Sequence, residues 1–164
     1  ALMIPIQVTF IPIYIVMANK GFSDTFLGLI LPVAVSPYFI FMLRQNFMAI
    51  DDSYVEAARI DGSGEFRTFN HIVLPLMKPA IAVQAIFTFV SSWNNYFIPA
   101  LILHDDSKKT LPILIAQLRA ADWLKFDMGQ VYVMIAFSIF PVIVVYLILS
   151  KHIVQGVALG SVKG

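Results

Sequence analysis

The sequence has 164 residues, of which 59% are hydrophobic and 13% are charged, and its mean hydropathy is +0.82. An average soluble domain has about 25% charged residues, so this composition excludes an ordinary soluble domain and indicates an integral membrane protein. The net charge of +1 gives no reason to expect nucleic acid as a partner, and the absence of cysteine excludes disulfide and thiolate chemistry.

Four long apolar stretches predict four membrane-spanning helices, so the expected fold class is all-α, a polytopic transmembrane helical bundle. No linker, low-complexity run or internal repeat divides the sequence, which predicts a single transmembrane domain over residues 1–164. The sequence begins without a methionine or a signal-peptide pattern, so we interpret it as part of a longer subunit.

The first two predicted spans contain prolines. The first span covers residues 2–18, and a membrane helix tolerates its prolines where neighbouring groups or water bind the freed carbonyls. The second span covers residues 26–43, and we expect Pro32 and Pro37 to kink it near its middle.

Residues 51–75, here called the elbow, form a long polar insert between apolar segments. Ser53 and Glu56 fit a capping box at the start of a first helix, in which Ala57 and Ala58 are strong helix formers. Gly62 then ends this helix.

Ser63 is predicted to cap a second short helix of the elbow. On this helix Phe66, Phe69 and Val73 form an apolar stripe, and Pro75 is expected to stop the helix. Isolated helices shorter than about 12 to 15 residues are marginal in water, so both helices need another surface to lie against. A partner protein is the expected surface.

The third predicted span covers residues 79–103 and holds an unusual polar run inside an apolar segment. Within this run, Trp93 and Tyr96 offer aromatic faces, and the amides of Asn94 and Asn95 offer donors and acceptors, which suits a conduit for a sugar. The alternative is that the two amides only join neighbouring helices through hydrogen bonds.

A charged segment over residues 104–127 follows, with a short interfacial helix predicted at residues 111–118 on the membrane side opposite the elbow. The last span is predicted at residues 128–149, and the tail at residues 156–164 then falls on the elbow's side. Lysine and arginine are divided almost equally between the two sides, so charge alone does not set the orientation.

The sequence carries no recognisable enzyme chemistry. It lacks the glycine-rich phosphate loop of an ATPase, so any ATP must be hydrolysed by another chain. Its three histidines are scattered singly and no serine stands in a nucleophile motif, so we predict no metal site, no cofactor and no catalytic residue.

One part of the elbow resembles the signature loop of permease subunits of binding-protein-dependent ABC importers. The residues that stand at the spacing of this motif are Glu56, Ala57, Ala58, Gly62, Ile72, Leu74 and Pro75. Asp61 and Pro79 resemble the carbohydrate-uptake branch in particular, although Ser63 stands where that branch has alanine. The glycine-spaced tail is similar to the ending of maltose-type permeases, whose tail contacts the ATPase pair; otherwise it is a frayed terminus.

The resemblance implies that the elbow is cytoplasmic and couples to an ATPase subunit. The coupling residues that it implies are Glu56, Ala57, Ala58, Asp61, Gly62, Phe66, Leu74 and Pro75. Glu56 would meet a basic residue in a cleft of the ATPase, unless it is only the capping carboxylate described above. Gly62 would transmit motion at the bend, and its alternative role is a C-terminal helix cap.

The resemblance further implies a multi-pass subunit of the inner (cytoplasmic) membrane, surrounded by lipid, whose first spans precede this sequence. Its partners would be an ATPase dimer, a second permease subunit and an extracellular or periplasmic solute-binding protein. The expected function is the import of a sugar or related solute, with no enzymatic activity of its own. The alternatives are an ABC permease for another solute, such as glycerol phosphate, and an intramembrane enzyme or scaffold.

Overall fold

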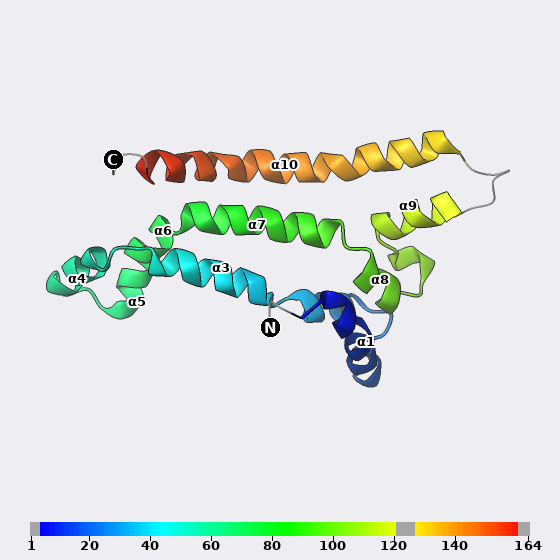
Figure 1. The fold of residues 1–164 in the computed structure, drawn as a ribbon, viewed down its shortest axis with the longest axis horizontal. Helices are drawn as coiled ribbons and strands as arrows, with labels where there is room; N and C mark the ends of the chain where they lie inside the picture. Colours follow the sequence, from blue (N-terminus) through cyan, green and yellow to red (C-terminus); the bar gives the residue numbers. More distant parts are fainter. Residues whose placement is uncertain (1–3, 121–126, 161–164) are drawn as a thin grey trace. The chain divides into compact units, whose positions relative to one another are not determined.

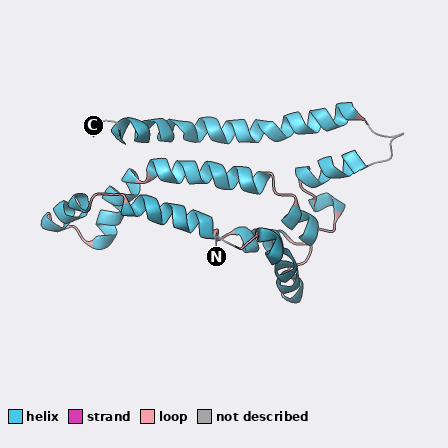
Figure 2. Cartoon of the chain, viewed as in Figure 1, coloured by secondary structure: helices cyan, strands magenta, loops and turns pink. Residues whose placement is uncertain are grey.

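The computed structural model describes residues 4–120 and 127–160 of the chain. Over these residues the chain is helical and contains no β-strand, as the all-α fold class predicted (Figure 1; Figure 2). The first residues of the first predicted span, the loop residues 121–126 and the tail residues 161–164 lie outside the described residues.

The chain divides into two compact units. Unit 1 consists of Ala1–Pro37 and Val90–Ile143, and unit 2 of Tyr38–Phe89 and Val144–Gly164. The boundary falls inside two long helices, because α7 (Lys78–Trp93) and α10 (Met128–Gly160) each contribute to both units. The single transmembrane domain over residues 1–164 stays a prediction.

Unit 1 contains short helices in addition to its parts of α7 and α10. Its further elements are η1 (Ile6–Thr9), α1 (Phe10–Asn19), α2 (Phe26–Ile30), η2 (Leu31–Val33), α8 (Phe97–Ile102), η4 (Asp106–Lys108) and α9 (Leu111–Ala120). The expected interfacial helix at residues 111–118 therefore exists as α9, while its position in a membrane stays a prediction.

The core of unit 1 is built around α8. Ile98, Ile102 and Leu103 are at most 3% exposed, and side chains of α1 and α2 pack against them. The rings of Phe10 and Phe97 stack with their centroids 5.4 Å apart. Burial of large apolar side chains of this kind stabilises each by about 1.5–3 kcal/mol, so α8 is the anchor of this unit.

The third predicted span is not one continuous helix. The structure ends α7 at Trp93 and begins α8 at Phe97, so residues 79–103 form two helices, and the span itself stays a prediction. The amide of Asn94 donates to the Val90 carbonyl (2.9 Å), and the amide oxygen of Asn95 accepts from the Ile98 N–H (3.3 Å). Side chains that bond to local backbone groups in this way compete with a continuing helix.

Unit 2 holds the elbow between two longer helices. Its elements are α3 (Pro37–Met48), α4 (Asp52–Ile60), α5 (Glu65–Thr68), the π-helical turn η3 (Phe69–Val73), α6 (Leu74–Leu76) and most of α7. The helical run Glu65–Leu76 continues one residue past Pro75 before it meets α7 at an angle of 68°. Pro75 thus lies one residue before the bend rather than at the end of the helix.

One helix is by itself long and apolar enough to cross a membrane, the 24-residue segment Met128–Lys151 of α10. Two further candidate spans are long and apolar enough only if two helices that meet at a bend are counted together. These pairs are Phe26–Val33 with Pro37–Met48 and Glu65–Leu76 with Lys78–Trp93. The described part of the first predicted span forms a shorter apolar helix, Ile6–Asn19. The expected number of four spans therefore stays a prediction.

Candidate functional sites

The elbow starts at a different cap from the one that the sequence predicted. Asp51 is the N-cap of α4, and its side chain accepts a hydrogen bond of 2.9 Å from the Ser53 N–H. Ser53 already lies inside the helix, so the predicted capping box of Ser53 and Glu56 is wrong. The Glu56 side chain is exposed and makes no hydrogen bond or ion pair with the described residues.

Gly62 ends α4 in a Schellman motif. Its φ is +75°, its N–H bonds to the Arg59 carbonyl (3.0 Å), and the Ser63 N–H bonds to the Ala58 carbonyl (2.9 Å). Nothing lies within 4 Å of the place where a Cβ of residue 62 would stand, so backbone conformation alone requires the glycine. The structure therefore gives Gly62 the role of a C-terminal cap.

The two helices of the elbow face each other through small and half-apolar side chains. Ala58, Thr68 and Val73 are 3–4% exposed. The Thr68 hydroxyl donates to the Ser63 hydroxyl (3.1 Å), and the N-cap of α5 is Gly64, so Ser63 does not cap the second helix as predicted. The close fit of Ala58 inside the elbow accounts for a small residue there.

The predicted apolar stripe of the second helix is also wrong. Val73 is 4% exposed, whereas Phe66 is 82% exposed and Phe69 is 43% exposed. The π-helical turn η3, Phe69–Val73, departs from the α-helical spacing on which the stripe was based, and Val73 does not share a face with Phe66. Phe66 and Ile60, which is 86% exposed, therefore present apolar surface outward.

The eight predicted coupling residues divide by exposure. Ala58 is buried, Leu74 is half-buried, and the exposed residues are Glu56, Ala57, Asp61, Gly62, Phe66 and Pro75. A surface ion pair joins the two helices, with the Arg59 Nη2 atom 2.8 Å from the Glu65 Oε1 atom. Both side chains of this pair are mostly exposed, so it adds little to stability.

A second candidate site lies within unit 1, at a pocket of about 310 Å³. Its lining residues are Trp93, Asn94, Tyr96, Pro112, Ile115, Ala116, Arg119 and Ser138. The structure thus brings three of the four predicted pathway residues to one pocket, while the Asn95 side chain accepts a hydrogen bond from the Ile98 N–H in the first turn of α8. Arg119 and α9 were not predicted as parts of this site.

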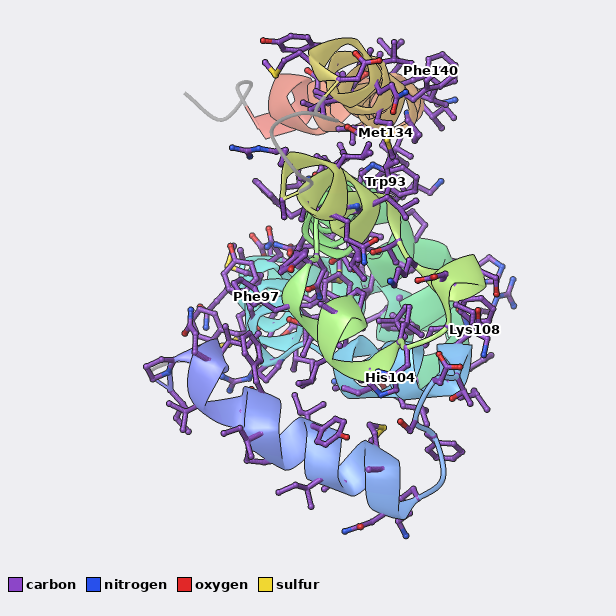
Figure 3. The ribbon with its side chains drawn as sticks, turned by 90° about the vertical axis from the view of Figure 1, so that its right-hand side faces the viewer. Trp93, Phe97, His104, Lys108, Met134 and Phe140 are labelled. Carbon is purple, nitrogen blue, oxygen red and sulfur yellow. The ribbon has the colours of Figure 1, made fainter. Side chains whose placement is uncertain are left out.

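Trp93 is fixed at this pocket by a bond to α10. Its indole Nε1–H donates to the Ser138 carbonyl oxygen at 2.9 Å. Figure 3 labels Trp93 and, on the following helix, Phe97. The Tyr96 ring packs edge-on against Phe97 with the centroids 5.5 Å apart. Because the amides of Asn94 and Asn95 bond to their own backbone, the helix-joining bond in this run comes from the tryptophan.

Sequence reasoning missed a polar cluster in unit 1. Asp24, with φ +54°, accepts hydrogen bonds from the N–H groups of His104 (2.9 Å) and Asp105 (3.0 Å), and its Oδ2 atom lies 2.7 Å from the Lys108 Nζ. Figure 3 labels His104 and Lys108 on the segment that follows α8. No local pattern signals this pairing, because the partners are far apart in the sequence.

The electrostatics of the cluster follow from these contacts. The hydrogen bond from Lys108, with those from the two N–H groups, holds the pKa of Asp24 far below its usual value. The same bond raises the pKa of Lys108 above its usual value. Both groups are charged at neutral pH, and the cluster ties the turn before α2 to the segment after α8.

Comparison with known proteins assigns the chain to a family. Residues 1–159 match the family described as the binding-protein-dependent transport system inner membrane component. The chain belongs to this family. Members of the family are membrane components of transport systems, and the ABC permease subunits among them are not themselves enzymes, as the sequence predicted.

Several curated members of the family are similar over nearly the whole chain. An arabinooligosaccharide transport permease of Bacillus subtilis is 34% identical over 99% of this chain and 57% of its own length. An sn-glycerol-3-phosphate transport permease of Brucella abortus is 37% identical over 94% of this chain and 55% of its own length. The chain thus spans about half the length of the curated relatives it matches.

A solved structure shares the fold. It is a bacterial ABC transporter involved in the import of the acidic polysaccharide alginate, with a TM-score of 0.72 and 28% identity. The match covers 86% of this chain and 55% of that chain. The predicted resemblance to ABC permease subunits of the carbohydrate-uptake type is therefore confirmed.

Proposed function

We propose that this chain is part of a membrane-spanning permease subunit of an ABC importer. The observation that carries the proposal is the family match over residues 1–159. In the proposed mechanism a binding protein delivers the solute from outside, and the permease alternates between outward and inward access. A partner ATPase dimer hydrolyses the ATP, because this sequence has no phosphate-binding loop.

The proposed solute is a sugar or a related hydroxylated compound. Relatives named for arabinooligosaccharides and a structural neighbour named for alginate support a carbohydrate. Glycerol phosphate is the second candidate, supported by the relatives named for it, which are 37% identical. Both solutes have several hydroxyl groups, which the aromatic and amide groups around Trp93 and Asn94 can contact.

The elbow is proposed to be the cytoplasmic coupling element. The exposed carboxylate of Glu56 has no partner among the described residues, and Ile60 and Phe66 present apolar side chains that are more than 80% exposed. A surface with unpaired charge beside exposed apolar groups suits docking on another protein. The buried contacts of Ala58 and Val73 hold the two helices as one body, so a push on α4 would pass to α7.

The remaining parts of the assembly are also proposals. A second permease subunit, identical or different, would complete the channel, and the subunit would cross the inner membrane several times. Lipid would surround the exposed apolar faces, such as that of Met128–Lys151. The tail at residues 156–164 is proposed to contact the ATPase pair.

The test is transport by the full-length subunit with its partners. The subunit, its second permease, the ATPase dimer and the binding protein are reconstituted in vesicles, and uptake of radiolabelled arabinobiose or glycerol 3-phosphate is measured with and without ATP on the ATPase side. ATP-dependent uptake of either solute supports the proposal. The proposal would be contradicted if the complex assembles but no binding protein stimulates its ATPase activity.

A further inference from the structure

The pocket beside Trp93 holds one cationic side chain and no carboxylate. Arg119, in the last turn of α9, lines it, and the other lining residues are neutral. Arg119 is exposed and makes no ion pair or hydrogen bond with the described residues. The cations Arg59, Lys108 and Lys109 in the described part of the chain do have carboxylate partners. Arg44 and Arg67 make no ion pair with the described residues either, so what distinguishes Arg119 is its place at the pocket.

The other polar and aromatic side chains of the pocket determine which contacts a ligand can make there. The indole N–H of Trp93 donates to the Ser138 carbonyl, so it is not available as a donor to a ligand. One N–H of the Asn94 amide bonds to the Val90 carbonyl, which leaves the amide oxygen free to accept from a hydroxyl group. The Tyr96 side chain, 39% exposed, adds an aromatic face and a hydroxyl.

The guanidinium defines the class of ligand. Its planar donors match the paired oxygens of a carboxylate or a phosphate, and such charge-assisted bonds are about twice as strong as neutral ones. A neutral sugar offers the guanidinium only neutral acceptors, so it gains less from this side chain than an anion does. The site therefore favours a solute that carries both hydroxyl groups and an anionic group.

We propose that the pocket lined by Trp93, Asn94, Tyr96 and Arg119 binds an anionic, hydroxylated solute, with the Arg119 guanidinium on its carboxylate or phosphate. The proposal rests on the function proposed above and narrows its solute from sugars in general to acidic ones. Arg119 is then the residue that selects acidic solutes over neutral ones of the same size.

Binding is tested separately from transport. The full-length complex is purified in detergent without nucleotide and without binding protein, and it is titrated calorimetrically with four probes. Glucuronate and glycerol 3-phosphate are the anions, and glucose and glycerol are their neutral counterparts. We expect an anion to bind at least about tenfold more tightly than its neutral counterpart. A ratio of this size corresponds to the free energy of one hydrogen bond to a charged group. The tighter of the two anions identifies a carboxylate or a phosphate as the preferred group.

The variants test the role of Arg119. R119Q is expected to weaken anion binding about tenfold or more, and R119K to give an intermediate loss because it keeps the charge without the planar fork. N94D is a second, shape-conserving variant whose carboxylate would pair with Arg119 and repel an anion. R44Q makes the same chemical change at an exposed arginine outside the pocket, and it should leave the affinity unchanged.

Three results would overturn the proposal: equal affinity for charged and neutral probes, no binding of any probe, or wild-type affinity in both R119Q and N94D. Assembly of each variant is checked by size-exclusion chromatography, and if R119Q does not assemble, N94D and R119K decide the question. ATP-driven uptake is assayed on the same preparations. Anion binding without any transport would contradict the proposed function but not the inference about the pocket. Transport of a neutral sugar without anion binding would support the proposed function and contradict the inference about the pocket.

Discussion

The Lys108 ammonium reaches Asp24 twice, at 2.7 Å from its Oδ2 atom and 2.8 Å from its carbonyl oxygen, although the residues are 84 positions apart. The Asp24 N–H in turn donates to the Ile102 carbonyl at 2.9 Å. Asp24 thus joins the turn before α2 to both the end of α8 and the segment after it. We call the pair of Asp24 and Lys108 the clamp. Because α8 carries the buried core of unit 1, the clamp fixes the chain at one end of this core.

We expect removal of either clamp partner to lower the thermal unfolding temperature of the full-length subunit in detergent. Asp24→Asn keeps a residue that tolerates φ +54° but removes the charge, and Lys108→Met leaves the Asp24 carboxylate with its backbone donors only. Lys20→Met is the control, because Lys20 is exposed and makes no ion pair with the described residues. The double variant should lose no more than the larger single loss, and simple addition of the two losses would contradict a direct pair.

The clamp also predicts a pH dependence of stability. The pKa of Asp24 is lowered on folding, so its contribution is present above the unfolded value of about 3.9 and is lost as pH falls below that value. The pKa of Lys108 is raised, so its contribution is lost only as pH rises above about 10.4. The difference in unfolding temperature between wild type and Asp24→Asn should stay constant between about pH 5 and pH 9 and shrink in stronger acid. A difference that changes near pH 7 would assign the effect to another group.

Sequence periodicity predicted the helical elements better than their side-chain roles. Helix α10 begins at Met128 and helix α9 at Leu111, as expected from the apolar patterns, and Gly62 ends α4 because only glycine adopts its φ of +75° at little cost. These features depend on residues close together in the sequence. Local composition is therefore sufficient to place them.

The sequence-based predictions were wrong where a neighbouring side chain makes the expected hydrogen bond instead, or where residues distant in the sequence determine the contact. Asp51 caps α4 in place of Ser53 because it stands one residue before the helix and its oxygen reaches the second amide of the turn. The π-turn Phe69–Val73 changes the period on which the apolar stripe was based. The clamp of Asp24 and Lys108 could not be predicted, because only the packing of α8 against α1 and α2 brings the two segments together.

Glu56→Arg is expected to uncouple transport from ATP hydrolysis. Glu56 is exposed and does not cap α4, so the substitution should leave the elbow folded while it places a like charge against the proposed basic cleft of the ATPase. Uptake and ATP hydrolysis are measured in the same vesicles, with Asp52→Arg as the control at an exposed carboxylate in the first turn. Normal uptake in Glu56→Arg vesicles would contradict the coupling role.

Asn94 and Asn95 should behave differently when each is changed to leucine. The Asn95 side chain accepts from the Ile98 N–H in the first turn of α8, so Asn95→Leu removes a hydrogen bond worth about 1 kcal/mol and should lower thermal stability. Asn94 lines the pocket and bonds only to its own helix, so Asn94→Leu should lower uptake while assembly stays intact. If Asn94→Leu also prevents assembly, its role is structural.

The last prediction concerns the side of the membrane that each loop faces. No cysteine occurs in this sequence, so a full-length subunit whose other cysteines are replaced by serine gives a clean background for one introduced thiol. Ser63 is a poor probe because it is half-buried, whereas Gly64 is exposed and has nothing within 4 Å of the position of a Cβ. Ser107 is exposed on the segment after α8 and provides the second position.

With one predicted span between them, Gly64→Cys and Ser107→Cys should face opposite compartments. In cells whose outer barrier is opened, a membrane-impermeant maleimide should label Ser107→Cys and spare Gly64→Cys, which should react only after the inner membrane is broken or inverted. The cysteine-free subunit is the control for background labelling, and labelling after denaturation shows that both thiols are present. Reaction of Gly64→Cys from outside would place the elbow away from a cytoplasmic ATPase, because an impermeant reagent cannot cross an intact membrane, and the proposed coupling would then be excluded.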